Sequence, residues 1–391
     1  MTKKRVCTAL NAAMILGVVL FLLLGLVRAV MHPKTVNDYE NRTAAQLPAF
    51  TLAGWLDGSF QEGVEAALGD QAPFSVTMKK RYNGMENAIK HRAFMLACAA
   101  WPEQTVIYED YRIYGGRHIA FAPETMEQTL PLLQTRTENF ARVISAHPET
   151  EFSVYYIERD MDVSFETGEK LGVFEYLQSN LPLPAQQMDC FEVNDLADFQ
   201  AGFYCTDHHW NWEGSYLGYQ EVAKLLGVEE PLTPEGDAVL ISSNFSGSKV
   251  QLLGSDNLFI EPFYAYQFPA ADMTVTINGE PGVYGQQEAF FAGNASYLTY
   301  GSFYGSDFGE VIFDAGEGEN LLILGESYDN AIVGLLASHF GRTHSVDLRH
   351  YESAMGEPFR LSRYLKENDI DRVLLIGCNR FFTQEDFALE D

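Results

Sequence analysis

The feature that most constrains this chain is an apolar run near its start. Residues Val6 to Val27 are uncharged and almost wholly apolar, with three cations at positions 3–5 before them and Arg28 after them. At about 1.5 Å per residue, a helix of this length spans the roughly 30 Å hydrocarbon core of a bilayer. The apolar core of a cleaved signal peptide is shorter and ends at a small-x-small site. The sequence therefore predicts a cytoplasmic tip and an uncleaved membrane anchor over residues 1–31, with a cleaved signal as the alternative.

The distribution of charge indicates on which side of the membrane the rest of the chain lies and which partners it does not bind. The positive flank belongs on the cytoplasmic side, and no second run of comparable length follows, so a single-pass protein with an extracytoplasmic bulk is expected. The 54 acidic and 26 basic side chains give a net charge of -28. Such a chain repels a phosphate backbone, which excludes nucleic acid as a partner.

The chain after the anchor has the composition of a globular protein. It contains 47% hydrophobic and 13% aromatic residues in a total of 391, enough to bury a sizeable core and too many for a disordered chain. Residues 32–50 are polar and contain two prolines, which predicts a linker. Residues 51–391 are expected to form the extracytoplasmic domain.

The pattern of apolar residues predicts an α/β fold. From residue 106, short apolar runs alternate with helical patterns. Between 233 and 314, glycines, aromatics and alternating runs replace the helices, so a β-rich insertion is expected, with a tight hairpin at Asn278 and Gly279. The α/β segments on either side are expected to share one parallel sheet, because together they bury more apolar area. Strands are predicted at 106–111, 152–157, 187–193, 321–324, 344–348 and 372–376, and helices at 55–70, 123–146, 168–178, 213–226, 330–340 and 359–367.

The five cysteines do not form a metal-binding pattern. No CxxC pair occurs, so a structural zinc site is not expected. Outside the membrane a disulfide is permitted, and Cys190 and Cys205 are the candidate pair because they flank one short segment. Two buried free thiols are the alternative.

The first segment with catalytic potential is Thr206 to Asn211, directly before the helix predicted at 213–226. In an extended stretch Asp207 and His209 would share one face, and His208 would point away. An Asp beside a His can fix the tautomer of the imidazole and leave Nε2 free as a general base. The alternative is a helix-entry segment capped by Asn211. A metal site is disfavoured, because adjacent histidines on opposite faces seldom bind one ion.

The second segment is a strand, a glycine turn and a helix. The apolar strand 321–324 leads through Gly325 and Glu326 to Ser327 at the predicted start of a helix, where the helix dipole and free amides favour a developing negative charge. A serine nucleophile needs this placement, although Ser327 as a simple helix cap is the alternative. Ser327 and the Asp207–His209 pair are together the two halves of a triad, whose order along the chain is immaterial.

These motifs resemble a known family. Asp207-His208-His209-Trp210 is the signature that names the DHHW protein family, which is similar to the SGNH-hydrolase-like proteins of alginate O-acetylation. The likeness covers most of residues 36 to 382. Further blocks that look like the family's are Glu40-Asn41-Arg42 with Pro48, Asp57-Gly58-Ser59-Phe60 with Glu65, Asp70-Gln71-Ala72-Pro73-Phe74, Gly325-Glu326-Ser327-Tyr328, Val346-Asp347-Leu348-Arg349-His350-Tyr351 and Ile370-Asp371-Arg372-Val373.

The resemblance implies a fold and a chemistry. The fold would be an SGNH-hydrolase-like three-layer α/β domain with a permuted motif order. Ser327 would be the nucleophile, His209 the base and Asp207 the orienting acid, with no cofactor and no metal. Active relatives move acetyl groups onto exopolysaccharide hydroxyls beside a multi-pass membrane O-acyltransferase, so the implied partners are an acyl donor, a polysaccharide acceptor and such a membrane protein.

Other positions are expected to support the site or bind substrate. Trp210 and Tyr328 flank the expected catalytic residues. Arg349 would bind an anionic group or pair with a carboxylate, and Asn379 would be a supporting donor or a loop cap. Glu326 departs from the family block, which has Asp there, and places a longer side chain next to the nucleophile.

Three functions remain open on the sequence. An extracytoplasmic O-acyltransferase acting on a cell-surface or secreted glycan is the leading hypothesis, and it requires a sugar hydroxyl to displace water as acceptor. A carbohydrate acetylesterase would use the same chemistry with water as acceptor. A non-catalytic glycan-binding or scaffold protein with a vestigial triad is the third, and Glu326 is the residue that favours it.

Overall fold

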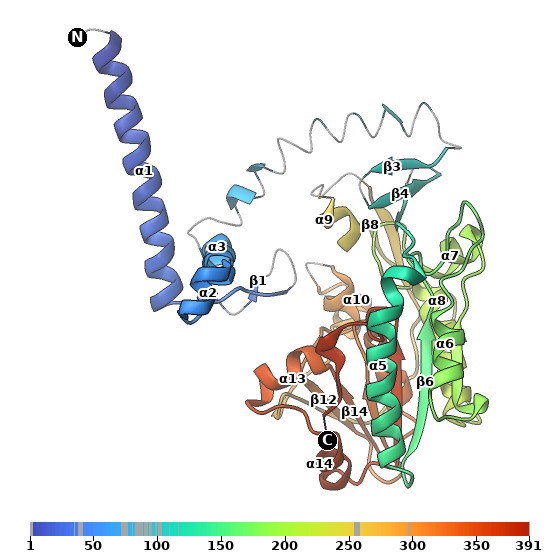
Figure 1. The fold of residues 1–391 in the computed structure, drawn as a ribbon. Helices are drawn as coiled ribbons and strands as arrows, with labels where there is room; N and C mark the ends of the chain where they lie inside the picture. The colour runs from blue at the N-terminus through green and yellow to red at the C-terminus, as the bar shows by residue number, and fades with distance from the viewer. Residues whose placement is uncertain are drawn as a thin grey trace. The chain divides into compact units, whose positions relative to one another are not determined.

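The computed structural model (Figure 1) divides the chain into two compact units, which are described separately below. The first comprises residues 1–94 with 251–256, and the second comprises 95–250 with 257–391. The structure describes residues 3–34, 36–37, 42–71, 77–79, 81–82, 89, 93, 96–97, 100, 104–108, 110–115, 117–253, 259–295 and 298–390. Parts of two family-like blocks, Glu40-Asn41 and Ala72-Pro73-Phe74, lie outside the described residues.

The first unit contains the apolar run and the helices that follow it. Helix α1 covers Lys3–Met31, and its window Met14–Met31, with a mean hydropathy of 2.6, is long and apolar enough to cross a membrane by length and composition. Two short paired strands and two helices follow. Their bounds are β1 (Val36–Asn37), β2 (Arg42–Thr43), α2 (Leu52–Asp57) and α3 (Ser59–Gln71).

The helix predicted at 55–70 is in fact two helices. Gly58 lies between them with φ of 93°, a left-handed conformation that favours glycine and ends α2. Helix α2 also begins earlier than predicted, because the Thr51 side chain accepts a hydrogen bond from the Gly54 amide and caps it.

The second unit is built on an eight-stranded mixed sheet, in the order β11-β10-β12-β14-β13-β15-β6-β7. The five strands from β14 to β7 are parallel, which confirms that the two α/β segments share one parallel sheet, and β12, β10 and β11 extend it with antiparallel pairs. Their bounds are β6 (Glu151–Ile157), β7 (Met188–Phe191), β10 (Thr274–Ile277), β11 (Glu280–Pro281), β12 (Glu310–Asp314), β13 (Asn320–Leu324), β14 (Arg342–Val346) and β15 (Arg372–Gly377).

Apolar side chains fill both faces of this sheet, because alternate residues of a strand point to opposite sides. On β13, Leu321 and Ile323 belong to one buried cluster, while Leu322 and Leu324 belong to another. Helices α8 (Trp212–Leu225) and α12 (Val333–Ala337) contribute to the first cluster. Helices that contribute to the second cluster include α5 (Met126–Ala146), α6 (Val173–Asn180) and α14 (Leu361–Glu367).

Several segments differ from the sequence-based prediction. The single strand expected at 106–111 is part of a three-stranded antiparallel sheet of β3 (Val106–Tyr108), β4 (Tyr111–Tyr114) and β5 (His118–Phe121). The helix predicted at 330–340 is a 3₁₀ turn, η2, at Asp329–Ala331 followed by the short α12. Outside the segment 233–314, the helices α7 (Leu196–Gly202) and α13 (Leu348–Met355) were not predicted.

The segment 233–314 contains both strands and short helices. The predicted hairpin is present, with Asn278 and Gly279 at φ of 49° and 83° between β10 and β11. The other elements are β8 (Val239–Phe245), α9 (Ser248–Leu252), β9 (Glu261–Ala265), α10 (Gln287–Phe291) and α11 (Tyr300–Tyr304).

The candidate disulfide does not form in this structure. Cys190 lies buried in β7 as a free thiol, and the free Sγ of Cys205 lies 3.3 Å from Nδ1 of His118. Burial raises the pKa of the Cys205 thiol to about 12, so this sulfur is neutral and unreactive at ordinary pH.

Candidate active site

The carboxyl edge of the parallel strands carries the candidate site. Ligands and catalytic groups of open α/β sheets gather at this edge, since the loops that follow the strands meet there. The Gly325-Glu326-Ser327 turn follows β13 at this edge, and Cys378 and Asn379 follow the neighbouring strand β15.

The structure brings Asp207, His209 and Ser327 into one hydrogen-bonded chain. Nδ1 of His209 lies 2.6 Å from Oδ1 of Asp207, and Nε2 of His209 lies 2.7 Å from Oγ of Ser327. Asp207 and His209 are buried and Ser327 is partly exposed. The arrangement has the connectivity of a Ser-His-Asp triad, with Ser327 at the solvent end.

The charge of Asp207 determines which ring nitrogen of His209 carries the proton. Burial alone would raise the pKa of Asp207, but its electrostatic interaction and hydrogen bond with His209 hold it well below its usual range. An ionised Asp207 accepts only, so Nδ1 of His209 carries the proton and Nε2 is left to accept from the Ser327 hydroxyl.

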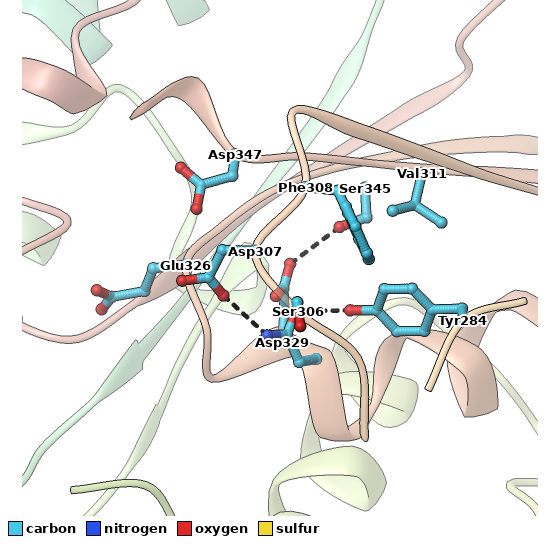
Figure 2. Close-up of a pocket in the computed structure, with 10 residues that line it drawn as sticks. Tyr284, Ser306, Asp307, Phe308, Val311, Glu326, Asp329, Ser345 and Asp347 are labelled. Atoms are coloured by element: carbon cyan, nitrogen blue, oxygen red, sulfur yellow. Dashed lines mark hydrogen bonds between the residues drawn. The ribbon is translucent and has the colours of Figure 1, made fainter. Parts of the chain in front are cut away.

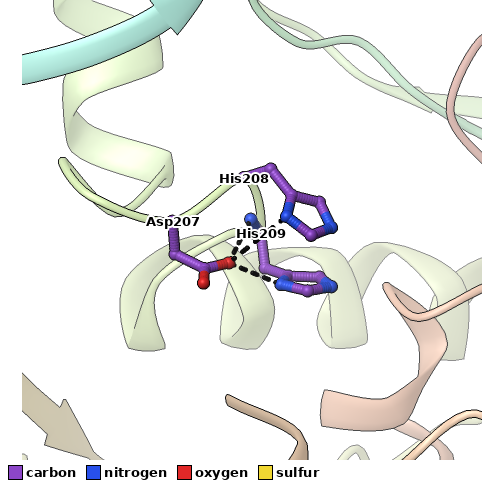
Figure 3. Close-up of side chains that lie close together, drawn as sticks. All are labelled: Asp207, His208 and His209. Atoms are coloured by element: carbon purple, nitrogen blue, oxygen red, sulfur yellow. Dashed lines mark hydrogen bonds and ion pairs between the residues drawn. The ribbon is translucent and has the colours of Figure 1, made fainter. Parts of the chain in front are cut away.

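The prediction that His208 points away from this pair is wrong. The rings of His208 and His209 lie side by side, with centroids 3.8 Å apart, as Figure 3 shows. The face alternation fails because residues 205–209 form a series of bends instead of an extended strand, closed by a bridge between Phe203 and Trp210. His208 Nδ1 lies 2.5 Å from Oγ of Ser248.

The first residue of α9, which sequence analysis missed, holds the carboxylate of Asp207. The amide of Ser248 donates to Oδ2 of Asp207 over 2.8 Å, while Oδ1 accepts from the His209 amide and ring. Gly247 makes the approach possible, because a Cβ at this position would lie 2.4 Å from that of Asp207. The side chain of Glu261 braces the preceding residues by accepting from the amides of Cys205 and Thr206.

Aromatic rings enclose the imidazole of His209. The ring of Tyr300 stacks on it with centroids 3.8 Å apart and planes 2° apart, and the ring of Tyr328 meets it edge-on. Tyr328 also donates from its hydroxyl to the carbonyl of His208, 2.6 Å away. Trp210 is fully buried and donates from Nε1 to the Tyr300 hydroxyl, so it supports the site from beneath. Tyr300 lies 90 residues from Trp210, and no sequence signal pointed to it.

The turn that carries Ser327 is fastened by Glu326. Oε1 of Glu326 accepts from the Cys378 amide over 2.7 Å, which joins the turn after β13 to the end of β15. The side chain of Glu326, which is longer than the Asp of the family block, therefore has a hydrogen-bond donor in the Cys378 amide. The expected helix dipole at Ser327 is not supported, because a 3₁₀ turn and a five-residue helix follow the serine instead of one long helix.

A small acidic cavity lies behind this turn. Its lining includes Asp307, Glu326, Asp329 and Asp347, drawn in Figure 2. Burial raises the pKa of Asp329 well above its usual value, and the nearby carboxylates of Asp347 and Asp307 raise it further, so the neutral form of Asp329 is favoured.

Arg349 compensates the charge of this cluster. Its guanidinium pairs with both oxygens of Asp347 and with Oδ2 of Asp307, the latter over 3.1 Å. Of the two alternatives for Arg349, the structure has the carboxylate pair. Nδ2 of Asn379 donates to Glu124 over 2.9 Å. In the described part of the chain, neither Arg349 nor Asn379 is hydrogen-bonded to Asp207, His209 or Ser327.

The geometry at the histidines suits a proton relay better than a metal. Asp207, His208 and His209 offer ligand atoms within 4.8 Å of one another. However, Nδ1 of His209 faces Asp207, its Nε2 faces Ser327, and Nδ1 of His208 faces Ser248, so these nitrogens are already engaged.

The fold and the site together define an α/β protein with a Ser-His-Asp chain at the carboxyl edge of a mixed sheet. No protein-family model matches the sequence, and a comparison with curated proteins finds no match. Among solved structures, the chain is similar to Bacillus cereus PatB1 with a sulfonyl adduct, with a TM-score of 0.51 and 18% identity over 74% of this chain and 99% of that chain. It is also similar to a DHHW family protein from Eubacterium siraeum, with a TM-score of 0.52 and 16% identity over 74% and 98%. The resemblance to the DHHW family is thus confirmed as a shared fold.

Proposed function

We propose that this protein is a membrane-anchored extracytoplasmic O-acyltransferase that acetylates a cell-surface or secreted polysaccharide through an acyl-Ser327 intermediate. The observation that carries the proposal is the hydrogen-bonded chain from Asp207 through His209 to Ser327, with separations of 2.6 and 2.7 Å. The orientation by Ser248 and the stacked ring of Tyr300 support it, because a relay needs a fixed imidazole.

The reaction would proceed in two balanced steps. Oγ of Ser327 attacks the acyl carbonyl of the donor while its proton passes to Nε2 of His209, and the donor's leaving group departs with that proton. The acceptor hydroxyl then attacks the acyl-serine, His209 takes its proton, and Ser327 Oγ recovers a proton as the new ester leaves. Asp207 stabilises the imidazolium in both steps. A multi-pass membrane O-acyltransferase would supply the donor.

The proposal is tested by trapping the acyl-enzyme. The full-length chain in detergent is incubated with an activated acetyl ester and digested, and mass spectrometry locates the added acetyl group. We expect the adduct on Ser327, its absence in Ser327→Ala, and slower formation and turnover in His209→Ala. A sulfonyl fluoride is a second probe, because PatB1 is known with a sulfonyl adduct. A folded protein that is modified by neither reagent at Ser327 would refute the proposal.

The acceptor is identified by a second measurement on the same protein. Acetyl-Ser327 is challenged with buffer alone and with soluble oligosaccharides, and free acetate and acetylated sugar are quantified. Acetyl transfer to sugar that exceeds release of acetate supports the transferase. Release of acetate unaffected by any sugar would show an esterase in its place.

A further inference from the structure

Apolar side chains that face solvent gather at the start of the helical part of the first unit. Phe50, Leu52, Trp55 and Leu56 are 64%, 68%, 50% and 77% exposed. The rings of Phe50 and Trp55 contact the ring of Phe60, with centroids 5.2 and 6.2 Å from it. These five residues are called the aromatic patch below. So many large exposed apolar groups in one short stretch indicate a binding surface.

The patch lies close to the apolar helix of the same unit. Helix α1 contacts α3, which follows α2 after one glycine. Near the carboxyl end of α1, Gly25 and Ala29 are buried, and their spacing of four residues places them on one face of the helix. Gly25 is inside the run expected to cross the membrane, and Ala29 lies about 3 Å beyond its last residue along the helix. Helix α3 therefore packs at the level where α1 would leave the bilayer.

Hydrogen bonds hold α3 at this level. The amide of Lys34 donates to Oε1 of Gln71 over 2.7 Å, and Nε2 of Gln71 donates to the Lys34 carbonyl over 3.0 Å. Lys34 is only three residues beyond the end of α1. The amide of Ala45 donates to Oδ2 of Asp70 over 2.8 Å, so Ala45 is tied to the same end of α3. The carboxyl end of α3 is thus attached to the segment that follows α1, and the aromatic patch lies at the amino end of the same helix.

We propose that the aromatic patch inserts into the outer interface of the bilayer that α1 crosses, so that α2 and α3 rest on the lipid surface. Trp and Phe are favoured at this depth, where the ring is apolar and the headgroup region is polar. The exposed side chains of Glu62 and Glu65 on α3 give no electrostatic attraction to anionic lipid. Binding is therefore expected to be apolar and independent of lipid charge. The inference rests on the membrane anchor in the proposed function, but not on the chemistry of Ser327.

The test uses tryptophan fluorescence of the full-length chain in vesicles. The protein is reconstituted into phosphatidylcholine vesicles with or without lipids brominated on the acyl chains, which quench tryptophans in contact with them. Trp55→Phe is the matched variant, because it keeps an aromatic ring of similar character while removing one of the four tryptophans. We expect wild type to be quenched by the brominated lipid and Trp55→Phe to lose most of that quenching. Adding phosphatidylserine should leave the difference unchanged.

Two results would overturn the inference. Equal quenching of wild type and Trp55→Phe, with the chain resistant to alkaline extraction, would show that Trp55 does not meet lipid and that a protein covers the patch instead. Release of the chain by alkaline extraction would remove the anchor on which the inference depends. Acetylation of Ser327 in the same vesicles reports the proposed chemistry separately, so failure of one proposal is distinguishable from failure of the other.

Discussion

At the scale of single residues, the site depends on the hydrogen bonds that both carboxylate oxygens of Asp207 accept. Both oxygens accept hydrogen bonds, from the His209 amide and ring on one side and from the Ser248 amide on the other. Hydrogen bonds to the ionised form favour it, which keeps the carboxylate charged in a buried position. Any change that moves Asp207 therefore changes the tautomer and position of His209 together.

Gly247→Ala tests this dependence. The added methyl group would lie 2.4 Å from Cβ of Asp207, so the carboxylate or the loop must shift. We expect acetylation of Ser327 to slow by roughly 10²-fold, because a displacement of about 1 Å costs that much in a positioned site. Gly236→Ala is the control, since a Cβ at Gly236 meets no atom within 4 Å. Equal rates for both variants would show that Gly247 does not position Asp207.

Asp329→Asn tests the raised pKa of the buried acid behind the serine turn. The raised folded-state pKa means that the folded protein keeps this proton after the unfolded chain has lost it, so stability falls as pH rises above about 4. Because Asn cannot ionise, the Asp329→Asn variant does not lose this stability as the pH rises. We expect the melting temperature of Asp329→Asn relative to wild type to increase between pH 4 and pH 8, measured by thermal unfolding in detergent. A difference independent of pH would contradict the assignment.

The sequence was informative about the residues that would react and uninformative about the residues that hold them. Asp207 and His209 are two positions apart, and Ser327 follows an apolar strand and a glycine, so local patterns reveal all three. Ser248 and Tyr300 lie 41 and 91 positions from Asp207 and His209, and they reach the site only through tertiary folding. His208 was misplaced because alternation of side chains holds only for extended backbone.

At the scale of elements, the short helix α11 presents Tyr300 to His209 and places Phe303 and Tyr304 in the buried core. A five-residue helix has little stability of its own. It is held by a capping box, in which the Thr299 hydroxyl accepts from the Ser302 amide over 2.9 Å and the Ser302 hydroxyl accepts from the Thr299 amide over 2.8 Å.

Thr299→Ala should loosen this helix. Loss of an N-cap costs about 1 kcal/mol, and the stacked position of Tyr300 would be less populated. We expect a lower melting temperature and slower acetylation of Ser327, with both restored in Thr299→Ser, which keeps the hydroxyl. Full activity in Thr299→Ala would indicate that the His209 ring is held by Tyr328 and Asp207 without Tyr300.

Elements with strong periodicity were predicted well, and short ones were not. The central strands β13 and β15 are nearly continuous apolar runs, because both faces of the sheet are covered, and such runs are visible in the sequence. Helices α7 and α13 have seven and eight residues, too few to repeat an apolar stripe twice. The small sheet of β3, β4 and β5 was reduced to one strand because its hairpins lack an Asn-Gly pair.

At the scale of the whole second unit, a buried lysine joins segments that are remote in sequence. Nζ of Lys249 donates to the Ile119 carbonyl in β5 over 2.7 Å and pairs with Asp160, beyond β6, over 2.9 Å. Burial lowers the pKa of Lys249, and burial alone would raise that of Asp160, but Lys249 and Arg159 hold the pKa of Asp160 below its usual value. Lys249 thus links α9, whose first residue orients Asp207, to the small sheet through Ile119 and to the end of β6 through Asp160.

Lys249→Met should destabilise the protein by about 3–5 kcal/mol, because it removes one partner of a buried pair and leaves a carbonyl without its donor. Denaturation followed by circular dichroism would measure the change. Lys366→Met is the control, since Lys366 is exposed and its replacement should cost less than about 0.5 kcal/mol. Similar effects of the two substitutions would show that the buried pair contributes little.

The strand order of the main sheet has a consequence for how the chain is made. Strand β15 is the last strand in sequence, yet it lies in the interior of the sheet, between β13 and β6. Until residues 372–377 have emerged, β6 with β7 and β13 with β14 are two half-sheets with open edges, and such edges pair readily with other chains. A chain that emerges from its amino end would therefore keep these open edges, and stay prone to association, until residues 372–377 pair with both half-sheets. The interval before β15 pairs is then the stage at which this fold is most vulnerable.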